Sequence, residues 1–177
     1  LYYVQEMAGR HFDRMALTAD LEYKNLIWVI IRHRLQVTRL PHKGETIRLE
    51  TWPMPTTRTA YPRSVVAYDE EGRECFRSIT LWVLMTLDTR VMIQPGKTDI
   101  QVAGTLRGLE LSSPKGLVPR DMVNSSFRRV AYCDIDRNGH MNNTRYLDWV
   151  SDLLPSGFHG THTPTEFTVC YTTEGRE

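Results

Sequence analysis

Apolar residues recur every three or four positions over the first 16 residues of the chain. Side chains with this spacing lie on one face of an α-helix, so residues 1–16 are predicted to form an amphipathic helix. No N-capping residue precedes this helix, and we therefore expect the natural N-terminus to lie further upstream. The apolar positions are Leu1, Val4, Met7, Ala8, Phe12 and Met15.

Between residues 26 and 88 the pattern changes to runs rich in β-branched and aromatic residues, several of which alternate with polar residues. Such runs predict β-strands, here over residues 26–40, 46–53, 61–68 and 74–88. The turn at His42-Lys43-Gly44 predicts that the first two strands form a hairpin. We expect all four strands to form a meander that wraps around the N-terminal helix.

Residues 104–126 are rich in Gly, Pro and Ser, which predicts a linker. After it we expect a short strand over 127–133, a helix over 144–154, a loop over 155–164 and a strand over 166–172. A helix followed by strands would then occur twice, with "YYVQEMAG" (2–9) and "RYLDWVSD" (145–152) in equivalent places. A single strand leaves a sheet edge open, so the second unit is expected to continue beyond residue 177.

The composition is that of an ordinary globular protein, with 41% hydrophobic and 24% charged residues among 177. The net charge of +1 argues against bulk nucleic-acid binding, and no apolar run approaches the length of a membrane helix. Cys75, Cys133 and Cys170 are too far apart to suggest a disulfide framework or a metal site, which favours a reducing compartment.

The stretch "CDIDRNGHMNN" (133–143) concentrates polar groups before the second predicted helix. If it is extended, Asp134, Asp136, Asn138 and His140 project to one side, because alternate side chains share a side. Asn142 and Asn143 are good helix N-caps, and a helix start offers free N–H groups to an oxyanion. Two interpretations remain open here: a site for acyl transfer or hydrolysis, and a polar turn that only caps a helix.

The pattern D-x-N-x-H-x-N-N-x-x-Y-x-x-W, which runs from Asp136 to Trp149, resembles the signature of the acyl-acyl-carrier-protein (acyl-ACP) thioesterases. Residues 1–12, 26–53 and 77–92 also resemble this family, in the family's order. The resemblance implies an α+β fold, a tandem (double) hot-dog in which each half is an antiparallel sheet around a long central helix. The expected parts are an acyl-binding half (1–103), the linker (104–126) and the beginning of a catalytic half (127–177).

The resemblance also implies the catalytic residues Asp136, Asn138 and His140, with Glu174 as the acid of the segment "YTTEGRE". Glu174 and His140 would activate a water molecule, and Asn138 would stabilise the oxyanion. Asp136 either orients this pair or attacks the thioester itself. Gly175 stands where the plant enzymes carry a cysteine, so a cysteine mechanism has no support. Cys133 and Cys170 are then expected to be buried small hydrophobic residues.

The implied reaction is hydrolysis of fatty acyl-ACP to free fatty acid and carrier protein, which terminates fatty-acid synthesis and needs no metal or cofactor. We expect a cytoplasmic protein of bacterial type that could form a homodimer. We expect no nucleic-acid or membrane partner. The acidic carrier protein would dock on basic residues, and an apolar cavity would hold the acyl chain. The basic candidates are Arg128 and Arg129, or Lys115 and Arg120; the cavity candidates are Met7, Trp28, Ile30, Trp52, Trp82 and Met85.

Two alternatives stay open. One is another hot-dog enzyme, which acts on acyl-CoA in place of acyl-ACP. The other is a non-catalytic module that binds acyl groups and retains the fold. The presence of Asp136, Asn138, His140 and Glu174 together argues against the second alternative, because binding alone does not require all four.

Overall fold

The structure, a computed structural model, describes residues 1–18, 21–118, 120–121, 125–136 and 139–175. The chain forms two compact units. Unit 1 consists of Leu1–Pro114 with Pro164–Val169, and unit 2 consists of Lys115–Thr163 with Cys170–Glu177. Each unit is described by itself.

The framework of unit 1 is an antiparallel sheet in the order β2-β3-β4-β1-β6, with β5 paired to β4. All four strands predicted between residues 26 and 88 are confirmed, within a few residues at their ends. The strands are β1 (Leu26–Val37), β2 (Arg48–Pro53), β3 (Tyr61–Tyr68), β4 (Glu74–Thr86), β5 (Met92–Ile93) and β6 (Glu166–Cys170).

The predicted hairpin of the first two strands is wrong, and so is the simple meander. β1 pairs with β4, from Leu26 opposite Thr86 to Val37 opposite Phe76, with a register shift between Ile30 and Arg32. The two longest strands thus match each other, whereas six-residue β2 would leave half of the β1 backbone groups unpaired. β6 occupies the other edge of β1.

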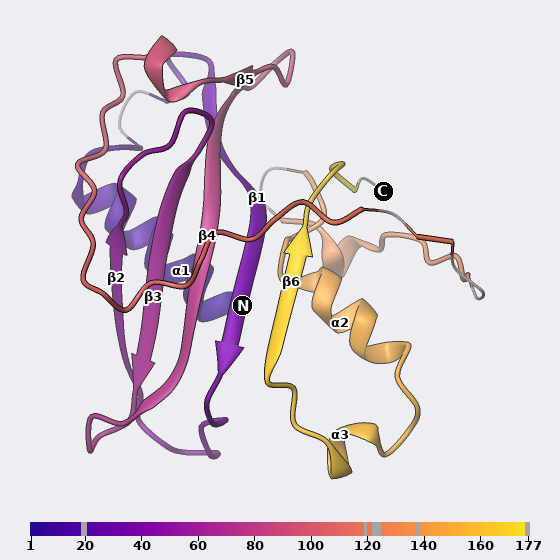
Figure 1. Ribbon diagram of the computed structural model, residues 1–177. Helices are drawn as coiled ribbons and strands as arrows, with labels where there is room; N and C mark the ends of the chain where they lie inside the picture. Colours follow the sequence, from indigo (N-terminus) through magenta and orange to yellow (C-terminus); the bar gives the residue numbers. More distant parts are fainter. Residues whose placement is uncertain (19–20, 119, 122–124, 137–138, 176–177) are drawn as a thin grey trace. The chain divides into compact units, whose positions relative to one another are not determined.

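Helix α1 (Tyr2–Arg14) covers one face of the sheet (Figure 1) and confirms the predicted N-terminal helix. Val4, Ala8 and Phe12 form its buried stripe. The Phe12 ring stacks on Trp28 with centroids 4.9 Å apart and meets Trp82 edge-on at 5.3 Å. These three residues, each four positions after the last, belong to the apolar pattern that predicts the helix, and their packing on the sheet stabilises it.

The opposite face of the sheet is crossed by residues 104–114, which we call the strap (Figure 1). Thr105 N–H donates to the Pro53 carbonyl at 3.0 Å, and Arg34 Nη1 donates to Ser112 Oγ at 2.6 Å. Between these points Leu111 is buried in a cluster with Ile79, Leu81, Val83 and Ala60. The strap makes up the first part of the stretch predicted as a linker, and it belongs to unit 1, where it packs on the sheet.

Unit 2 contains a 3₁₀ turn η2 (Tyr132–Asp134), helix α2 (Arg145–Asp152) and a short helix α3 (Phe158–Thr161). The predicted helix over 144–154 is confirmed by α2, while α3 lies inside a stretch predicted as loop. The strand predicted over 127–133 is wrong: Phe127 and Tyr132 are exposed, so the apolar residues that suggested it bury nothing there. No helix within the described ranges is long and apolar enough to span a bilayer.

Three polar residues on neighbouring strands are buried in the α1 face of unit 1. Arg63 and His33 both pair with Thr80 in the sheet register, and all three side chains are at most 3% exposed. Arg63 Nη1 lies 2.8 Å from His11 Nδ1 of α1, and the Arg63 guanidinium lies over the Phe12 ring. His33 Nε2 has no hydrogen-bond partner within the described residues. This histidine is therefore buried without compensation for a positive charge.

Burial lowers the pKa of His33 from its ordinary value of 6.5 to about 3. The unfolded chain takes up this proton below about pH 6.5, whereas the folded protein does not take it up until about pH 3. The free energy of unfolding is therefore expected to fall between these values, by about 1.4 kcal/mol per pH unit from this group. Urea unfolding of the wild type and His33→Met between pH 7 and 4 measures the effect. The variant curve should be flatter, and parallel curves would contradict the assignment.

Candidate active site

The loop that carries the predicted catalytic residues folds back on itself. Asp136 N–H donates to the His140 carbonyl at 2.9 Å, and Gly139 N–H donates to the Asp136 carbonyl at 3.1 Å. Ile135 and Met141 form an antiparallel bridge, and Gly139 adopts a φ of +76°, which favours glycine. The described residues of the loop therefore form a turn and do not meet the condition of an extended loop, but the turn still places Asp136 opposite His140. Asn138 lies outside the described residues.

Asp134 has a structural role. Its side chain is buried, and Oδ2 accepts the Ala131 N–H at 3.1 Å. Its backbone carbonyl accepts the Asn142 N–H at 2.8 Å. Asp134 thus holds the two ends of the loop together.

His140 and Glu174 meet although they come from separate segments. His140 Nε2 lies 3.3 Å from Glu174 Oε2, and their side chains are 13% and 29% exposed. A backbone bond from Met141 N–H to the Gly175 carbonyl, 2.8 Å long, joins the two segments beside this pair. Asp136 Oδ1 accepts the His140 N–H at 3.4 Å. The structure therefore brings the half-buried His140 imidazole and the Glu174 carboxylate within hydrogen-bonding distance. The Asp136 carboxylate binds the backbone N–H of His140.

The start of α2 differs in one detail from the prediction. The residue at the N-cap position is Thr144, whose side chain makes no capping hydrogen bond, in place of the expected Asn142 or Asn143. The expected side-chain bond is nevertheless made by Asn142, two residues earlier, where its Oδ1 accepts both the N–H and the hydroxyl of Thr144 at 2.9 and 2.8 Å. This arrangement is an Asx turn, which fixes the chain as it enters the helix.

Two tyrosines near the pair were given no role from the sequence. Tyr146, the second residue of α2, accepts the Gly175 N–H at 3.3 Å, and Tyr171 Oη donates to the Asn143 carbonyl at 3.1 Å. Both are part of the segments that carry the resemblance, as the Y of Y-x-x-W and the first residue of "YTTEGRE". That shared membership is the signal that could have identified them.

The cysteines take no part in the described geometry of the pair. Cys133 is exposed, so the expectation that it is buried is wrong, while Cys170 is half-buried with Sγ 3.7 Å from the Lys115 carbonyl. The η2 turn exposes Cys133 because Asp134 is the residue it buries. Among the residues that the structure describes, no group of three or more His, Cys, Asp or Glu side chains could hold a metal ion.

The predicted acyl-chain residues do not share one face of the sheet. Trp28 and Trp82 lie on the α1 face, where both contact Phe12. Trp52 lies beneath the strap, with Nε1 donating to Glu110 Oε1 at 3.0 Å. Met85 packs against the cluster that contains Leu111. Met7 lies half-buried on α1.

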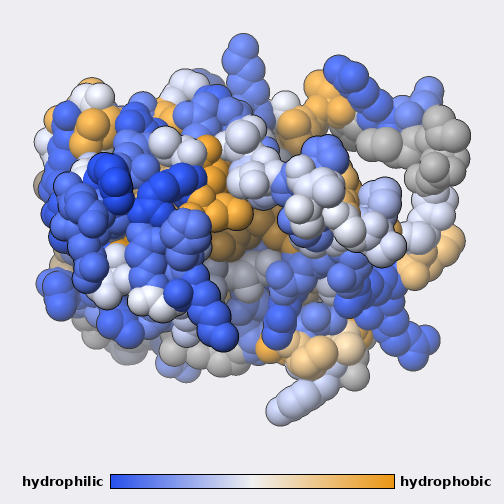
Figure 2. All heavy atoms as spheres, turned by 90° about the horizontal axis from the view of Figure 1, so that it is seen from below, coloured by the Kyte–Doolittle hydropathy of each residue, from blue (hydrophilic) through white to orange (hydrophobic). Residues whose placement is uncertain are grey.

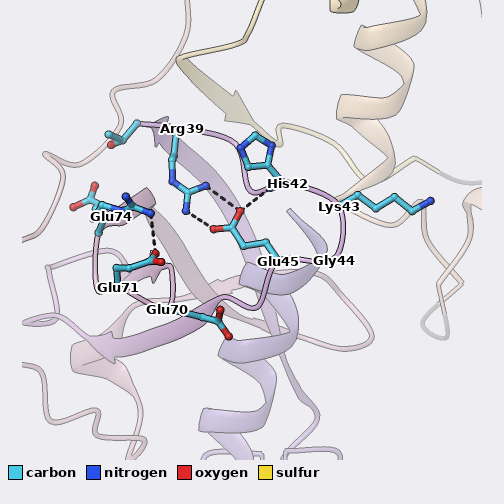
Figure 3. Close-up of a pocket in the computed structure, with 10 residues that line it drawn as sticks. Arg39, His42, Lys43, Gly44, Glu45, Glu70, Glu71 and Glu74 are labelled. Atoms are coloured by element: carbon cyan, nitrogen blue, oxygen red, sulfur yellow. Dashed lines mark hydrogen bonds and ion pairs between the residues drawn. The ribbon is translucent and has the colours of Figure 1, made fainter.

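Unit 1 has a hollow of about 760 Å³ at the end of the sheet, between residues 38–45 and 70–74 (Figure 3). Arg39 binds Glu45 and the buried Asp69 there, and its hydrogen bond lowers the pKa of Glu45 to about 2. The surface over this end of the sheet is mostly hydrophilic (Figure 2). Apart from Gly44, the residues that line the hollow are polar or charged, and two ion pairs, Arg39–Glu45 and Arg73–Glu71, lie among them.

The basic residues proposed from the sequence differ in their surroundings. Arg128 forms an ion pair with Asp152 and lies 4.8 Å over the Trp149 ring, so its charge is already partly compensated. Lys115, Arg120 and Arg129 are exposed. An exposed cation keeps its charge available to an acidic surface.

Comparison with known proteins identifies the family. The family model described as "Acyl-ACP thioesterase N-terminal domain" matches residues 1–100, and the corresponding C-terminal domain matches residues 120–177. The chain is 26% identical to the chloroplastic palmitoyl-acyl carrier protein thioesterase of Gossypium hirsutum, covering 96% of this chain and 44% of that protein. It is 25% identical to oleoyl-acyl carrier protein thioesterase 1 of Arabidopsis thaliana, covering 96% and 50%. The chain thus spans about half the length of these curated relatives.

Solved structures agree on the fold. An acyl-ACP thioesterase from Bacteroides thetaiotaomicron matches with a TM-score of 0.81 and 24% identity, over 99% of this chain and 72% of that one. The 12:0-ACP thioesterase from Umbellularia californica matches with a TM-score of 0.78 and 23% identity, over 99% and 74%. The predicted α+β hot-dog architecture is confirmed, and because the two family models cover most of its length, the chain belongs to the acyl-ACP thioesterase family.

Proposed function

We propose that the protein hydrolyses fatty acyl-ACP thioesters to free fatty acid and carrier protein. The observation that carries this proposal is the approach of His140 Nε2 to Glu174 Oε2 at 3.3 Å. A carboxylate paired with an imidazole can hold a water molecule and accept its proton. Both residues lie in the region that matches the family's C-terminal domain.

In the proposed reaction, Glu174 and His140 position a water molecule between them. Glu174 accepts one proton from this water as its oxygen bonds to the thioester carbonyl carbon, and the proton passes on to His140. Asn138 and a backbone N–H near the start of α2 stabilise the resulting oxyanion. When the C–S bond breaks, the proton held by His140 passes to the departing thiolate. The products are a carboxylic acid and the carrier thiol. A thioester is an activated acyl group, and these residues supply each proton transfer.

Asp136 is assigned the orienting role in this proposal. Its Oδ1 accepts the His140 N–H, and its backbone N–H and C=O close the turn at His140 and Gly139. A carboxylate engaged in holding the turn supports the geometry of the imidazole. This arrangement favours orientation of His140 over direct attack on the thioester.

The proposed partner is an acyl carrier protein, the carrier in the names of the relatives from Gossypium hirsutum and Arabidopsis thaliana. Those names specify palmitoyl and oleoyl groups, so a long-chain fatty acyl group is the proposed cargo. Exposed Lys115, Arg120 and Arg129 of unit 2 are the proposed contacts for an acidic carrier surface.

The test compares two thioesters of the same acyl chain. Purified protein should release free fatty acid from palmitoyl-ACP with kcat/KM at least about tenfold above that for palmitoyl-CoA, because binding energy from the carrier contributes to the transition state. A preference for the CoA thioester would instead identify an acyl-CoA thioesterase. Acyl binding without release of fatty acid would identify a non-catalytic module.

A further inference from the structure

The segment that carries Glu174 is held to the start of α2 by two phenol side chains. At one end, Tyr171 Oη donates to the Asn143 carbonyl at 3.1 Å. At the other end, Gly175 N–H donates to Tyr146 Oη at 3.3 Å. The two rings meet edge to face, with centroids 5.4 Å apart and planes at 76°. Residues 171–175 are thus fixed on both sides of the Glu174 carboxylate.

Gly175 connects the Tyr146 hydroxyl to the segments that carry Glu174 and His140. Its carbonyl accepts the Met141 N–H at 2.8 Å, so both of its backbone polar groups are bonded. A Cβ on Gly175 would lie 3.1 Å from Met141 Cβ and 3.3 Å from Tyr146 Oη, which is closer than an ordinary side-chain contact. Glu174 directly precedes Gly175, and His140 directly precedes Met141. The bonds at Gly175 therefore determine how closely the carboxylate approaches the imidazole.

The Tyr171 hydroxyl keeps its proton and therefore remains a hydrogen-bond donor. Burial raises the pKa of this phenol above its ordinary value, so the hydroxyl stays protonated throughout the physiological range. A neutral phenol can donate to the Asn143 carbonyl at any pH at which the enzyme works. The anchor on α2 is therefore independent of pH.

We propose that Tyr146 and Tyr171 are positioning residues, which keep Glu174 at hydrogen-bonding distance from His140. The inference rests on the proposed function, because it concerns the same pair of residues. Tyr146 acts through the Gly175 N–H, and Tyr171 acts through the helix start at Asn143. Loss of either hydroxyl lets the Glu174 segment move away from the imidazole, and small displacements of catalytic groups reduce turnover strongly.

The test removes one hydroxyl and keeps its ring. For Tyr146→Phe we expect kcat on palmitoyl-ACP to fall about tenfold while KM stays within about twofold, because the lost restraint concerns the reacting groups. Tyr171→Phe should lower kcat about fivefold by the same route. Tyr132→Phe is the matched control, since Tyr132 is 87% exposed in the same unit, and it should leave kcat and the melting temperature unchanged.

A second variant distinguishes positioning from general support of the fold. If Tyr146 acts through Glu174, then Tyr146→Phe should cause no further loss of kcat in a Glu174→Gln background. An equal loss in both backgrounds would overturn the inference, as would a Tyr146→Phe kcat within about twofold of the wild type. Failure of the wild type to hydrolyse palmitoyl-ACP would overturn the proposed function instead, so the two failures are distinguishable.

Discussion

Replacement of Glu174 by glutamine is expected to lower kcat for palmitoyl-ACP hydrolysis by about a thousandfold, with a much smaller effect on KM. Glutamine keeps the size of the side chain and its hydrogen-bonding capacity but cannot accept a proton from water. The proposed base would therefore be lost while the 141–175 backbone bond stays in place. Release of free palmitate under single-turnover and steady-state conditions measures the effect.

His140→Gln should give a loss of similar size, because the two side chains act on the same water molecule in the proposed reaction. Glu70→Gln is the control, since Glu70 is an exposed carboxylate of unit 1. It should retain wild-type kcat. A Glu174→Gln enzyme with more than about a tenth of wild-type turnover would exclude Glu174 as the base.

Replacement of Gly104 by alanine is expected to produce the largest loss of stability. A Cβ at this position would lie 2.1 Å from the Met54 carbonyl oxygen and 2.5 Å from the Pro55 nitrogen, both of them backbone atoms. Neither backbone atom can rotate away from the new Cβ. The first residue of the strap must therefore move away from the sheet. The neighbouring bond from Thr105 to Pro53 and the burial of Leu111 depend on that entry. We expect the free energy of unfolding to fall by about 3 kcal/mol.

Chemical unfolding in urea measures this change, and the melting temperature should fall by about 6–12 °C in parallel. Gly96→Ala is the matched control, because a Cβ on Gly96 meets no atom within 4 Å. It should change the free energy of unfolding by less than about 0.5 kcal/mol. Equal stability of the two variants would show that the strap tolerates displacement.

The periodicity of the sequence predicts which segments form helices and strands of unit 1 but not how the strands pair. Alternation reports that one side of a strand is buried, and it carries no information about its neighbour. The expected hairpin followed the general tendency of consecutive strands to pair. The structure instead places β1 between β4 and β6, where long strands satisfy each other's backbone groups. The same limit applies to Trp52, whose burial was foreseen but not the face on which it lies.

The strap shows a different limit. Residues 104–126 were read as a linker because Gly, Pro and Ser are common in connections. At Gly104 a side chain has no room, since a Cβ there would overlap the Met54 carbonyl. Leu111 packs in the buried cluster, and Glu110 accepts the hydrogen bond from Trp52. The sequence around these two residues has no pattern that predicts either contact. A sequence of this composition cannot distinguish a free connection from a segment that packs without regular secondary structure.

The candidate site was predictable mainly through the resemblance. The polar loop alone allowed a capping turn, and the described geometry includes such a turn at Asn142. Glu174 lies in another segment, and no local pattern connects it with His140. The resemblance named both residues, and the structure brings them to 3.3 Å. Their two supporting tyrosines lay within the same quoted segments, but their roles depend on hydrogen bonds that only the folded chain shows.

The pairing of β1 with β4 has a consequence for the order of folding. β2, β3 and β4 are joined by short connections, so their pairings form from contacts that are local in the chain. β1 precedes these three strands in the chain but pairs with β4, from Leu26 with Thr86 to Val37 with Phe76. Pairing β1 with β4 closes the long loop between them, which costs chain entropy. The hydrogen bonds to an already formed β4 edge offset this cost. Strand β1 is therefore expected to be among the last to dock, although it is the first strand to be synthesised.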